Sequence, residues 1–487
     1  MFGWFKKLAT RGRVVAARAI AGRYDAAQTT EDNRRHWANA DALSAAAANS
    51  PAVRRKLRDR SRYEVGNNCY ADGIVTTLSN DVIGTGPRLQ LLIDQPGDDI
   101  KRSANQVERQ FLLWSKKTGL AAKLRTMRRA MATDGEAFAI LIANPQLDHS
   151  IKLDLRLVEA EQVTTPGMLG LGADEADGIR FDRWGNPTEY HVLKNHPGGQ
   201  SVMGPLEYDV IPAANVIHLF RADRPGQVRG VPEITPALPL FALIRGYTLS
   251  VVKAARTAAM MAGILYTDAA GGDADEVEQF LAIDMEDNAL LTMPNQWKMQ
   301  QMKAEQPVTG FGEFIKTCLM EIARCVCMPR SIAMGSSEGL NYSSGRLDHQ
   351  TYFRAVGISQ SEVEITACDR ILSAWLNEAA MVTGVIPAGL GLFGDWDHLW
   401  FWDAPEHVDP EKEANAALSL LEGGLLTEAE YNARGGKDWE QVQSQRAKEL
   451  GITVEEYQTI KRNKLLGPPA RPTSQPDQQE ADDAQAA

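Results

Sequence analysis

Hydrophobic residues follow two different periodicities in the first half of this chain. Apolar positions recur at helical spacing over residues 54–78, and the stretch NDVIGTGPRLQLLI then leads through glycines and a proline into a short strand. Over residues 153–220 extended patterns dominate, and turn residues at 185–187 separate two of the runs. Together these patterns predict an α+β fold for this half.

The middle of the chain is predicted to be helical. Residues 234–265 follow helical periodicity and become alanine-rich in their second half, which predicts a helix about 40 Å long. A single subunit offers no obvious place to bury so long an apolar face, so the pattern predicts self-association. A second helix is expected to end before Pro329, and a third helical pattern follows from Arg346.

The C-terminal part carries clear helix boundaries. One helix is expected to start after Asp409 and to end at Gly423 and Gly424, and Gly451 is expected to end another. Two capping-box patterns mark helix starts, Thr427 with Glu430 and Thr453 with Glu456. These signals predict a small helical domain. From Gly467 onward the chain is Pro-rich and polar, which favours a disordered tail.

Length and composition favour several domains. The chain has 487 residues, 44% of them hydrophobic, whereas a single core stops growing at about 250–300 residues. No apolar run reaches the ~20 residues that cross a bilayer, so no membrane partner is expected. The N-terminus is basic, but Arg18 interrupts its apolar stretch, so no secretory signal is predicted.

Charge is distributed unevenly along the chain. Residues 1–62 hold fourteen Lys and Arg against five Asp and Glu, a balance of +9. Of the totals of 52 and 63, this leaves 38 basic and 58 acidic residues, or −20, for the remainder. The basic arm could contact nucleic acid or an acidic partner, or could be a solvated tail. The acidic remainder argues against a continuous basic surface that wraps DNA.

The sequence predicts neither a metal nor a cofactor. Five cysteines cannot all pair, and the nearest two form C-x-C within a helical pattern, which is typical of neither a disulfide framework nor a zinc site. This favours a reducing cytoplasm. The GTGP stretch lacks a phosphate-binding glycine pattern, and GGKD at Gly435 has aspartate where a Walker A loop needs a hydroxyl.

Two stretches of the sequence are candidates for an enzyme site. Ser337 lies in GSSEG, which matches G-x-S-x-G, but a nucleophile elbow needs a buried strand before the serine and a helix directly after it. The preceding residues instead predict a helix end and a loop. A nuclease would need clustered carboxylates that hold Mg²⁺. The candidates close together in sequence are Asp134, Glu136, Asp154 and Glu159.

Seven segments in order carry a resemblance to a known family. They are YDAA at residues 24–27 followed by Trp37, LRDRSRYEVGNNCYADGIVTTLSNDVIGTGPRLQ, DGEAF from Asp134, GIRFDRWGNPTEYHV, RPGQVRGVPEITPAL from Arg224, NYSSGR from Asn341, and DPEKEANAALSLLEGGLLTEAEYNARGGKDWEQVQSQRAKE. On these segments the chain resembles phage portal proteins of the lambda-like branch. The first half of the loop AMGSSEGLNYSSGR departs from the family pattern.

The resemblance implies a ring, usually of twelve subunits, at one capsid vertex, through which double-stranded DNA is packaged and ejected. It implies a portal fold divided as follows: a basic N-terminal arm 1–59, a wing 60–233 and 347–405, stem helices 234–265 and 310–328, a clip 266–309, a tunnel loop 329–346, a helical crown 406–466 and a disordered tail 467–487. The protein would act in the virion, after assembly in the host cytoplasm.

The resemblance also implies roles for particular residues and partners. The DNA-facing tunnel loop would present Ser336, Ser337, Asn341, Tyr342, Ser343, Ser344 and Arg346. The clip would bind the terminase large subunit through Asp275, Glu276, Glu278 and Gln279. Neighbouring subunits would meet at Ala254, Ala255, Ala258 and Ala259. Arg346 could contact DNA or pair with an acid of the neighbouring chain.

Further partners implied are a head-tail connector, the major capsid protein and scaffolding proteins, and no catalytic residue is expected. The alternatives are an enzyme acting on nucleic acid, a serine hydrolase that uses Ser337, and a tail-side adaptor.

Overall fold

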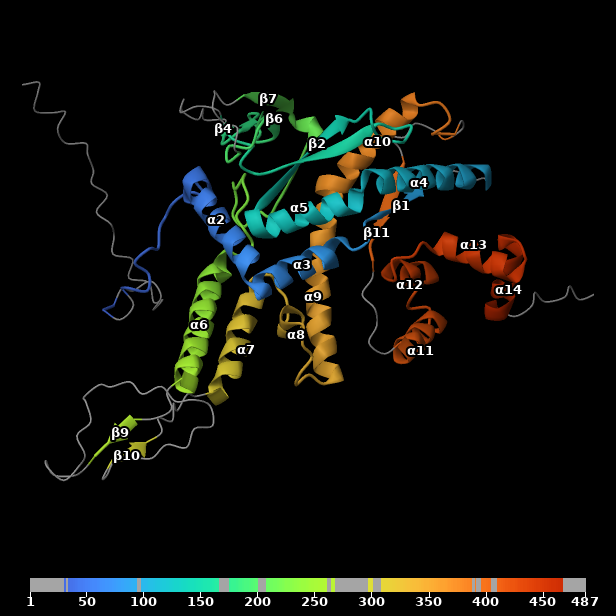
Figure 1. The fold of residues 1–487 in the computed structure, drawn as a ribbon. Coiled ribbons are helices and arrows are strands. Elements are labelled where there is room, and N and C mark those ends of the chain that lie inside the picture. Colours follow the sequence, from blue (N-terminus) through green and yellow to red (C-terminus); the bar gives the residue numbers. More distant parts are fainter. Residues whose placement is uncertain are drawn as a thin grey trace, which may run out of the picture.

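The structure is a computed structural model of the chain. It describes residues 30–31, 34–93, 98–165, 175–199, 207–260, 264–267, 297–300, 308–387, 390, 396–403 and 410–466. Most of the expected N-terminal arm, most of the expected clip and the tail 467–487 therefore lie outside the described residues. Figure 1 shows a mixed α/β body, two long helices that project from it, and a separate group of C-terminal helices.

Four helices form one layer of the α/β body. After the short α1 (Ala45–Ala48), they are α2 (Pro51–Asn67), α3 (Cys69–Ile83), α4 (Asp98–Thr118) and α5 (Leu120–Asp134). The helical pattern at 54–78 is thus two helices, because Asn68 adopts extended backbone and its side chain accepts a hydrogen bond from the Tyr70 amide. Apolar residues of α3 and α5 pack into the main core.

The strands of the described residues form four antiparallel sheets. The central one has the order β3–β2–β8, from β2 (Glu136–Ala143), β3 (Leu153–Val158) and β8 (Val216–Phe220). A second sheet is formed by β4 (Glu175–Ala176), β5 (Ile179–Phe181), β6 (Pro187–Leu193) and β7 (Tyr208–Pro212). The other two are pairs: β1 (Arg88–Leu92) with β11 (Asp397–Phe401), and β9 (Ile264–Tyr266) with β10 (Lys298–Gln300). The predicted α+β class and the turn at 185–187 are confirmed.

The first of the two projecting helices follows a short 3₁₀ turn, η3 (Thr235–Ala237), and the second follows β10 in the chain. They are α6 (Leu238–Met260) and α7 (Val308–Arg324), which run side by side (Figure 1). Tyr247 of α6 stacks on Phe311 of α7, with ring centroids 5.6 Å apart. After α8 (Arg330–Met334), a long rod is built from α9 (Tyr342–Val363), a π-helical turn (Glu364–Cys368) and α10 (Asp369–Met381).

The predicted boundaries of these helices need correction. The helix predicted over 234–265 ends at Met260, and Leu265 lies in β9, so α6 is about 35 Å long. The second helix, α7, ends at Arg324, earlier than expected. Cys325 and Cys327, the two cysteines of the C-x-C pattern, lie in the turn that follows it. All five cysteines are free.

The C-terminal helix group is α11 (Pro410–Glu422), α12 (Glu428–Arg434), α13 (Trp439–Leu450) and α14 (Val454–Leu466). Both predicted capping boxes are confirmed, because Thr427 and Glu430 bond each other's backbone amides, as do Thr453 and Glu456. Gly451 has a φ of +68° and ends α13, as its position predicts.

A network of arginines and carboxylates joins α2 to the central sheet. Arg54, Arg58 and Arg62 are four residues apart on α2, so they lie on one face of the helix. Arg54 pairs with Asp177, and Arg62 lies 2.7 Å from Asp134. These three arginines belong to the segment predicted as a basic arm, and the network engages them inside the fold.

Glu136 lies at the centre of this network. Its side chain is fully buried, and its carboxylate lies 2.7 Å from Arg229, 3.4 Å from Arg58 and 3.1 Å from His218. Burial opposes ionisation of Glu136, but the charge of Arg229 and the hydrogen bonds from His218 and Arg229 hold its pKa well below the ordinary value. Glu136 is therefore ionised inside the body.

Two glycines allow the segment that carries Arg229 to reach β2. Gly135 has a φ of +93°, and a Cβ there would lie 2.5 Å from the carbonyl carbon of Val231. A Cβ at Gly230 would lie 2.0 Å from the carbonyl oxygen of Gly135. The DGEAF and RPGQVRG segments therefore pack directly on each other, and glycine is required at both contacts.

Replacing Glu136 with Gln is predicted to lower the free energy of unfolding by about 3–5 kcal/mol, because it leaves Arg229 and Arg58 buried with one carboxylate fewer. Glu159→Gln is the control, since this side chain is 58% exposed and pairs at the surface; its effect should stay within about 1 kcal/mol. Urea unfolding followed by circular dichroism measures both. Equal stability of the two variants would contradict a central role for Glu136.

Candidate nucleic-acid interface

The segment between α7 and α9 presents an exposed polar loop. Pro329 caps α8, and Gly335, with a φ of +61°, ends that helix after five residues. Ser336 and Ser337 are exposed in the turn that follows. The backbone amide of Leu340 donates to the carbonyl of Ser337 at 3.2 Å, which closes the turn.

The second half of the predicted loop is helical, which corrects the prediction of a loop over 329–346. Asn341 is the N-cap of α9, and its side chain accepts from the Ser344 amide at 2.8 Å. The Ser344 hydroxyl in turn accepts from the Asn341 amide at 3.2 Å. This reciprocal pair starts the helix, so Tyr342, Ser343 and Arg346 stand on its first turns and are exposed there.

Contacts from two other elements reach this segment. Lys316 of α7 lies 3.4 Å from Glu338 in the turn. Arg346 lies 3.3 Å from Glu413 of α11, and the Lys412 ammonium lies 5.3 Å from the centre of the Tyr342 ring. Arg346 thus has an acidic partner in its own chain. The loop is attached to both the projecting helices and the C-terminal helix group.

The backbone around Ser337 does not have the geometry of a nucleophile elbow. The serine follows a short helix and precedes a turn, whereas an elbow requires a strand before the serine and a helix after it. A catalytic serine also needs a histidine, and His398 in β11 is bonded to Asp369 of α10 at 3.1 Å. These observations favour the loop interpretation over the serine hydrolase.

The carboxylates considered for a nuclease have basic partners. Asp134 and Glu136 belong to the arginine network, and Asp154 pairs with Lys123. Burial raises the pKa of Asp134, and Arg62 opposes that change. Because each carboxylate has a neighbouring cation, the group is not arranged to hold Mg²⁺.

One further cluster could in principle hold a metal. Ligand atoms of Glu159, Glu161 and His196 lie within 4.8 Å of one another. Arg62, however, already bonds both carboxylates, at 3.2 Å. The Nδ1 atom of His196 accepts from the Gly198 amide, so the proton of the neutral ring lies on Nε2, which faces the carboxylates. The cluster fits an ion-pair network and does not fit a metal site.

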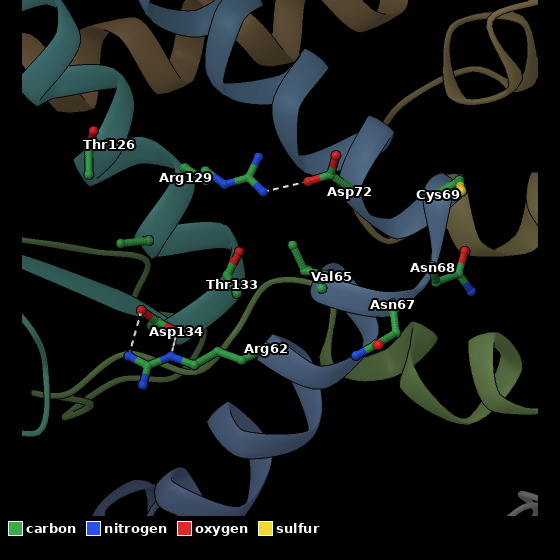
Figure 2. Close-up of a pocket in the computed structure, with 12 residues that line it drawn as sticks. Arg62, Val65, Asn67, Asn68, Cys69, Asp72, Thr126, Arg129, Thr133 and Asp134 are labelled. Atoms are coloured by element: carbon green, nitrogen blue, oxygen red, sulfur yellow. Dashed lines mark hydrogen bonds and ion pairs between the residues drawn. The ribbon is translucent and has the colours of Figure 1, made fainter. Parts of the chain in front are cut away.

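A cavity of about 700 Å³ opens between α2, α3 and α5 (Figure 2). Its walls carry two ion pairs, Arg62 with Asp134 and Arg129 with Asp72 at 2.5 Å. The exposed Cys69 stands at its edge. Its four charged residues therefore balance each other, and the cavity shows no preference for an anion or a cation.

The residues predicted for assembly lie on or beyond α6. Ala254 is half-buried and Ala255 is exposed, whereas the side chains of Ala258 and Ala259 lie outside the described residues. Asp275, Glu276, Glu278 and Gln279, predicted for the clip, also lie outside the described residues.

Larger apolar residues of α6 are also exposed, and they were not singled out from the sequence. Leu243, Leu249 and Val252 are 67%, 56% and 59% exposed. By length and composition alone, the stretch Thr235–Arg256 is long and apolar enough to cross a membrane, which the apolar runs of the sequence did not predict. Arg245 lies within this stretch and pairs with Glu64 of α2 at 2.9 Å. The buried Leu238, Phe241 and Ile244, together with the pair to Glu64, thus fix the first half of the helix to the body, while the exposed apolar residues stay uncovered.

Comparisons with known proteins find both relatives in sequence and similar solved structures. A portal protein labelled as probable, from Halomonas phage phiHAP-1, is 25% identical over 429 residues, which is 81% of this chain and 81% of that protein. A chain from the virion of a native gene transfer agent particle has 12% identity and a TM-score of 0.46, over 78% of this chain and 93% of that chain. A chain from the neck of an empty particle of this kind has 13% identity and a TM-score of 0.47, over 79% and 94%.

Residues 31–360 match the family model described as phage portal protein, lambda family. The matched segment includes the arginine network, both projecting helices and the exposed loop. Since it spans more than half of the sequence, the chain belongs to the lambda family of phage portal proteins.

Proposed function

We propose that this portal protein forms a ring of twelve subunits at one capsid vertex, and that double-stranded DNA passes through the ring during packaging and ejection. The observation that carries the assembly is the uncovered apolar surface of α6. Exposed apolar surface of this extent marks an interaction site, and a closed ring covers the same surface on every copy.

Within this proposal the elements take the following places. The body from α2 to β8, with α9, α10 and β11, forms the wing, and α6 with α7 forms the stem. The clip includes β9 and β10, the tunnel loop is reduced to residues 329–341, and α11–α14 form the crown.

The exposed turn is proposed to face the DNA. Ser336, Ser337 and Ser343 offer hydroxyl groups for transient hydrogen bonds to phosphate, and Arg346 offers a charge that Glu413 already partly balances. An acidic body suits passage of DNA, because a wall that neutralised many phosphates would hold the duplex in place. The balance of −20 beyond residue 62 supports sliding rather than capture.

The chain is proposed to be structural and to have no catalytic centre. ATP hydrolysis during packaging would belong to the terminase, whose large subunit would dock on the clip before the head-tail connector takes its place. Capsid and scaffolding proteins would contact the wing. Assembly would occur in the host cytoplasm, and the mature protein would stand in the virion. The geometry around Ser337 and the paired carboxylates favours this over the enzyme alternatives.

Ala255→Leu is predicted to disrupt ring assembly. The larger side chain would overpack the contact between neighbouring stems by about 1–3 kcal/mol at each interface. Ala416→Leu is the matched control, because Ala416 is also exposed on a helix but lies in the crown. Mass photometry of the purified proteins measures assembly. Rings of Ala255→Leu that are as abundant as those of the control would show that this face does not lie between subunits.

A deletion of Ser336–Leu340 is predicted to leave rings assembled and to reduce DNA packaging or retention. Asn341 is kept because it caps α9. Ser337→Ala should package DNA nearly as well as the parent, since one neutral hydrogen bond contributes about 0.5–1.5 kcal/mol and the loop offers substitutes. A packaging assay with purified terminase and procapsids compares them. Loss of activity in Ser337→Ala together with a harmless deletion would restore the nucleophile hypothesis.

Reversal of charge at Asp275, Glu276 and Glu278 to Lys is predicted to spare the ring but to prevent terminase binding or tail joining, because an acidic docking surface would become basic. Reversal of the exposed Glu449 in α13 is the control. Sizing of the rings and a pull-down with terminase give the two readouts. If the triple variant binds terminase and joins tails normally, these residues do not form the docking surface.

A further inference from the structure

An acidic cavity separates the C-terminal helix group from the α/β body. It has a volume of about 370 Å³, and four carboxylates line it: Glu108 of α4, Asp397 of β11, and Asp438 and Glu440 at the start of α13. None of the described residues that line it is Lys, Arg or His. Two parts of the fold therefore meet across carboxylates of like charge.

Close contacts hold the two parts together beside this cavity. The Gln90 side chain in β1 donates to Asp438 at 2.8 Å. Gly436, which precedes α13, has a φ of +64°, and a Cβ there would lie 2.1 Å from the carbonyl oxygen of Trp402. The backbone of the C-terminal helix group thus lies directly against the end of β11. Asp438 and Glu440 are brought to Glu108 by these contacts.

Glu108 is the buried member of the group. It is 8% exposed, and one of its oxygens accepts from the Leu91 amide at 2.7 Å. The groups that face it are Gln90 and the Leu91 amide from β1, Asn105 from its own helix, Asp397 from β11, and Asp438 and Glu440 from α13. Burial raises the pKa of Glu108 to about 7, and the charges of Asp438 and Glu440 add to the rise.

We propose that protonation of Glu108 controls how tightly the C-terminal helix group docks on the α/β body. Neutral Glu108 lets Asp438 and Glu440 approach, whereas ionised Glu108 repels them across the cavity. This proposal rests on contacts within one subunit and not on the proposed ring. Either proposal can therefore be refuted without refuting the other.

The sign of the pH dependence follows from the direction of the shift. Docking brings the charges of Asp438 and Glu440 to Glu108, so the pKa of Glu108 is higher in the docked state than in the released state. At low pH Glu108 is protonated in both states, so docking is strongest. As pH rises towards about 7, the released state ionises first while the docked state keeps its proton. The docking equilibrium constant then falls by up to about tenfold for each pH unit. Once Glu108 is ionised in both states, the constant does not change further with pH.

A change in docking has a path to the exposed loop. Helix α11 belongs to the same C-terminal group and contacts the first turns of α9 through Glu413 and Arg346. Release of the group at α13 would loosen this contact as well. Glu108 would in this way act on the position of the loop from the other side of the body.

Hydrogen exchange of the assembled full-length protein tests the proposal. The protection of amides in α13 is measured at about pH 5.5 and pH 7.5 for the parent and for Glu108→Gln, which stays neutral and can still accept from the Leu91 amide. Comparison at the same pH cancels the intrinsic pH dependence of exchange. At the higher pH, the amide protection factors of α13 are expected to be at least about tenfold lower in the parent than in Glu108→Gln.

Two further variants sharpen the result. Asp438→Asn keeps the cap of α13 and the acceptor for Gln90 but removes one of the repelling charges, so it is expected to reduce the pH effect. Glu411→Gln, an exposed carboxylate of α11, is expected to behave as the parent. The proposal is overturned if the parent shows no pH effect in α13, or if Glu108→Gln shows the same effect as the parent.

Discussion

Arg229 and Glu136 are buried against each other, and the α/β body is organised around this pair. Neither charge could stay inside without the other, because an isolated buried ion costs several kcal/mol. The pair brings the loop after β8 onto the start of β2, where Gly135 and Gly230 allow backbone contact. Arg58 extends it to α2, so one set of charges fixes helix, sheet and loop in one arrangement.

The body also fixes the position of α6 and α7, where the proposed assembly surface lies. Arg245 fixes α6 to Glu64 of α2, and the stacked rings of Tyr247 and Phe311 hold α7 beside it. Three large apolar residues of α6, Leu243, Leu249 and Val252, stay exposed, beside polar residues such as Ser250 and Lys253. Within the proposed ring, these exposed apolar residues are the surface that a neighbouring subunit covers.

Local patterns predicted the local features well. Capping boxes, the glycine after α13 and the hairpin turn involve residues within a few positions of each other, so they can be read from the sequence alone. The arginines of α2 could not be read this way, because Arg54 and Arg62 find their carboxylates 123 and 72 residues away. Because these carboxylates are so distant in the sequence, the arginines of α2 were counted with the basic N-terminal stretch. The start of α9 was missed because Ser344 replaces the Glu or Gln of the usual capping box.

In the proposed ring, α6 of each subunit is covered by a neighbouring copy. Cryo-electron microscopy of the purified full-length chain tests it directly, because it shows both the number of subunits and the position of α6. The account predicts a ring of about a dozen copies with the exposed leucines of α6 buried between adjacent subunits. A monomeric protein, or a ring in which α6 faces solvent, would contradict it.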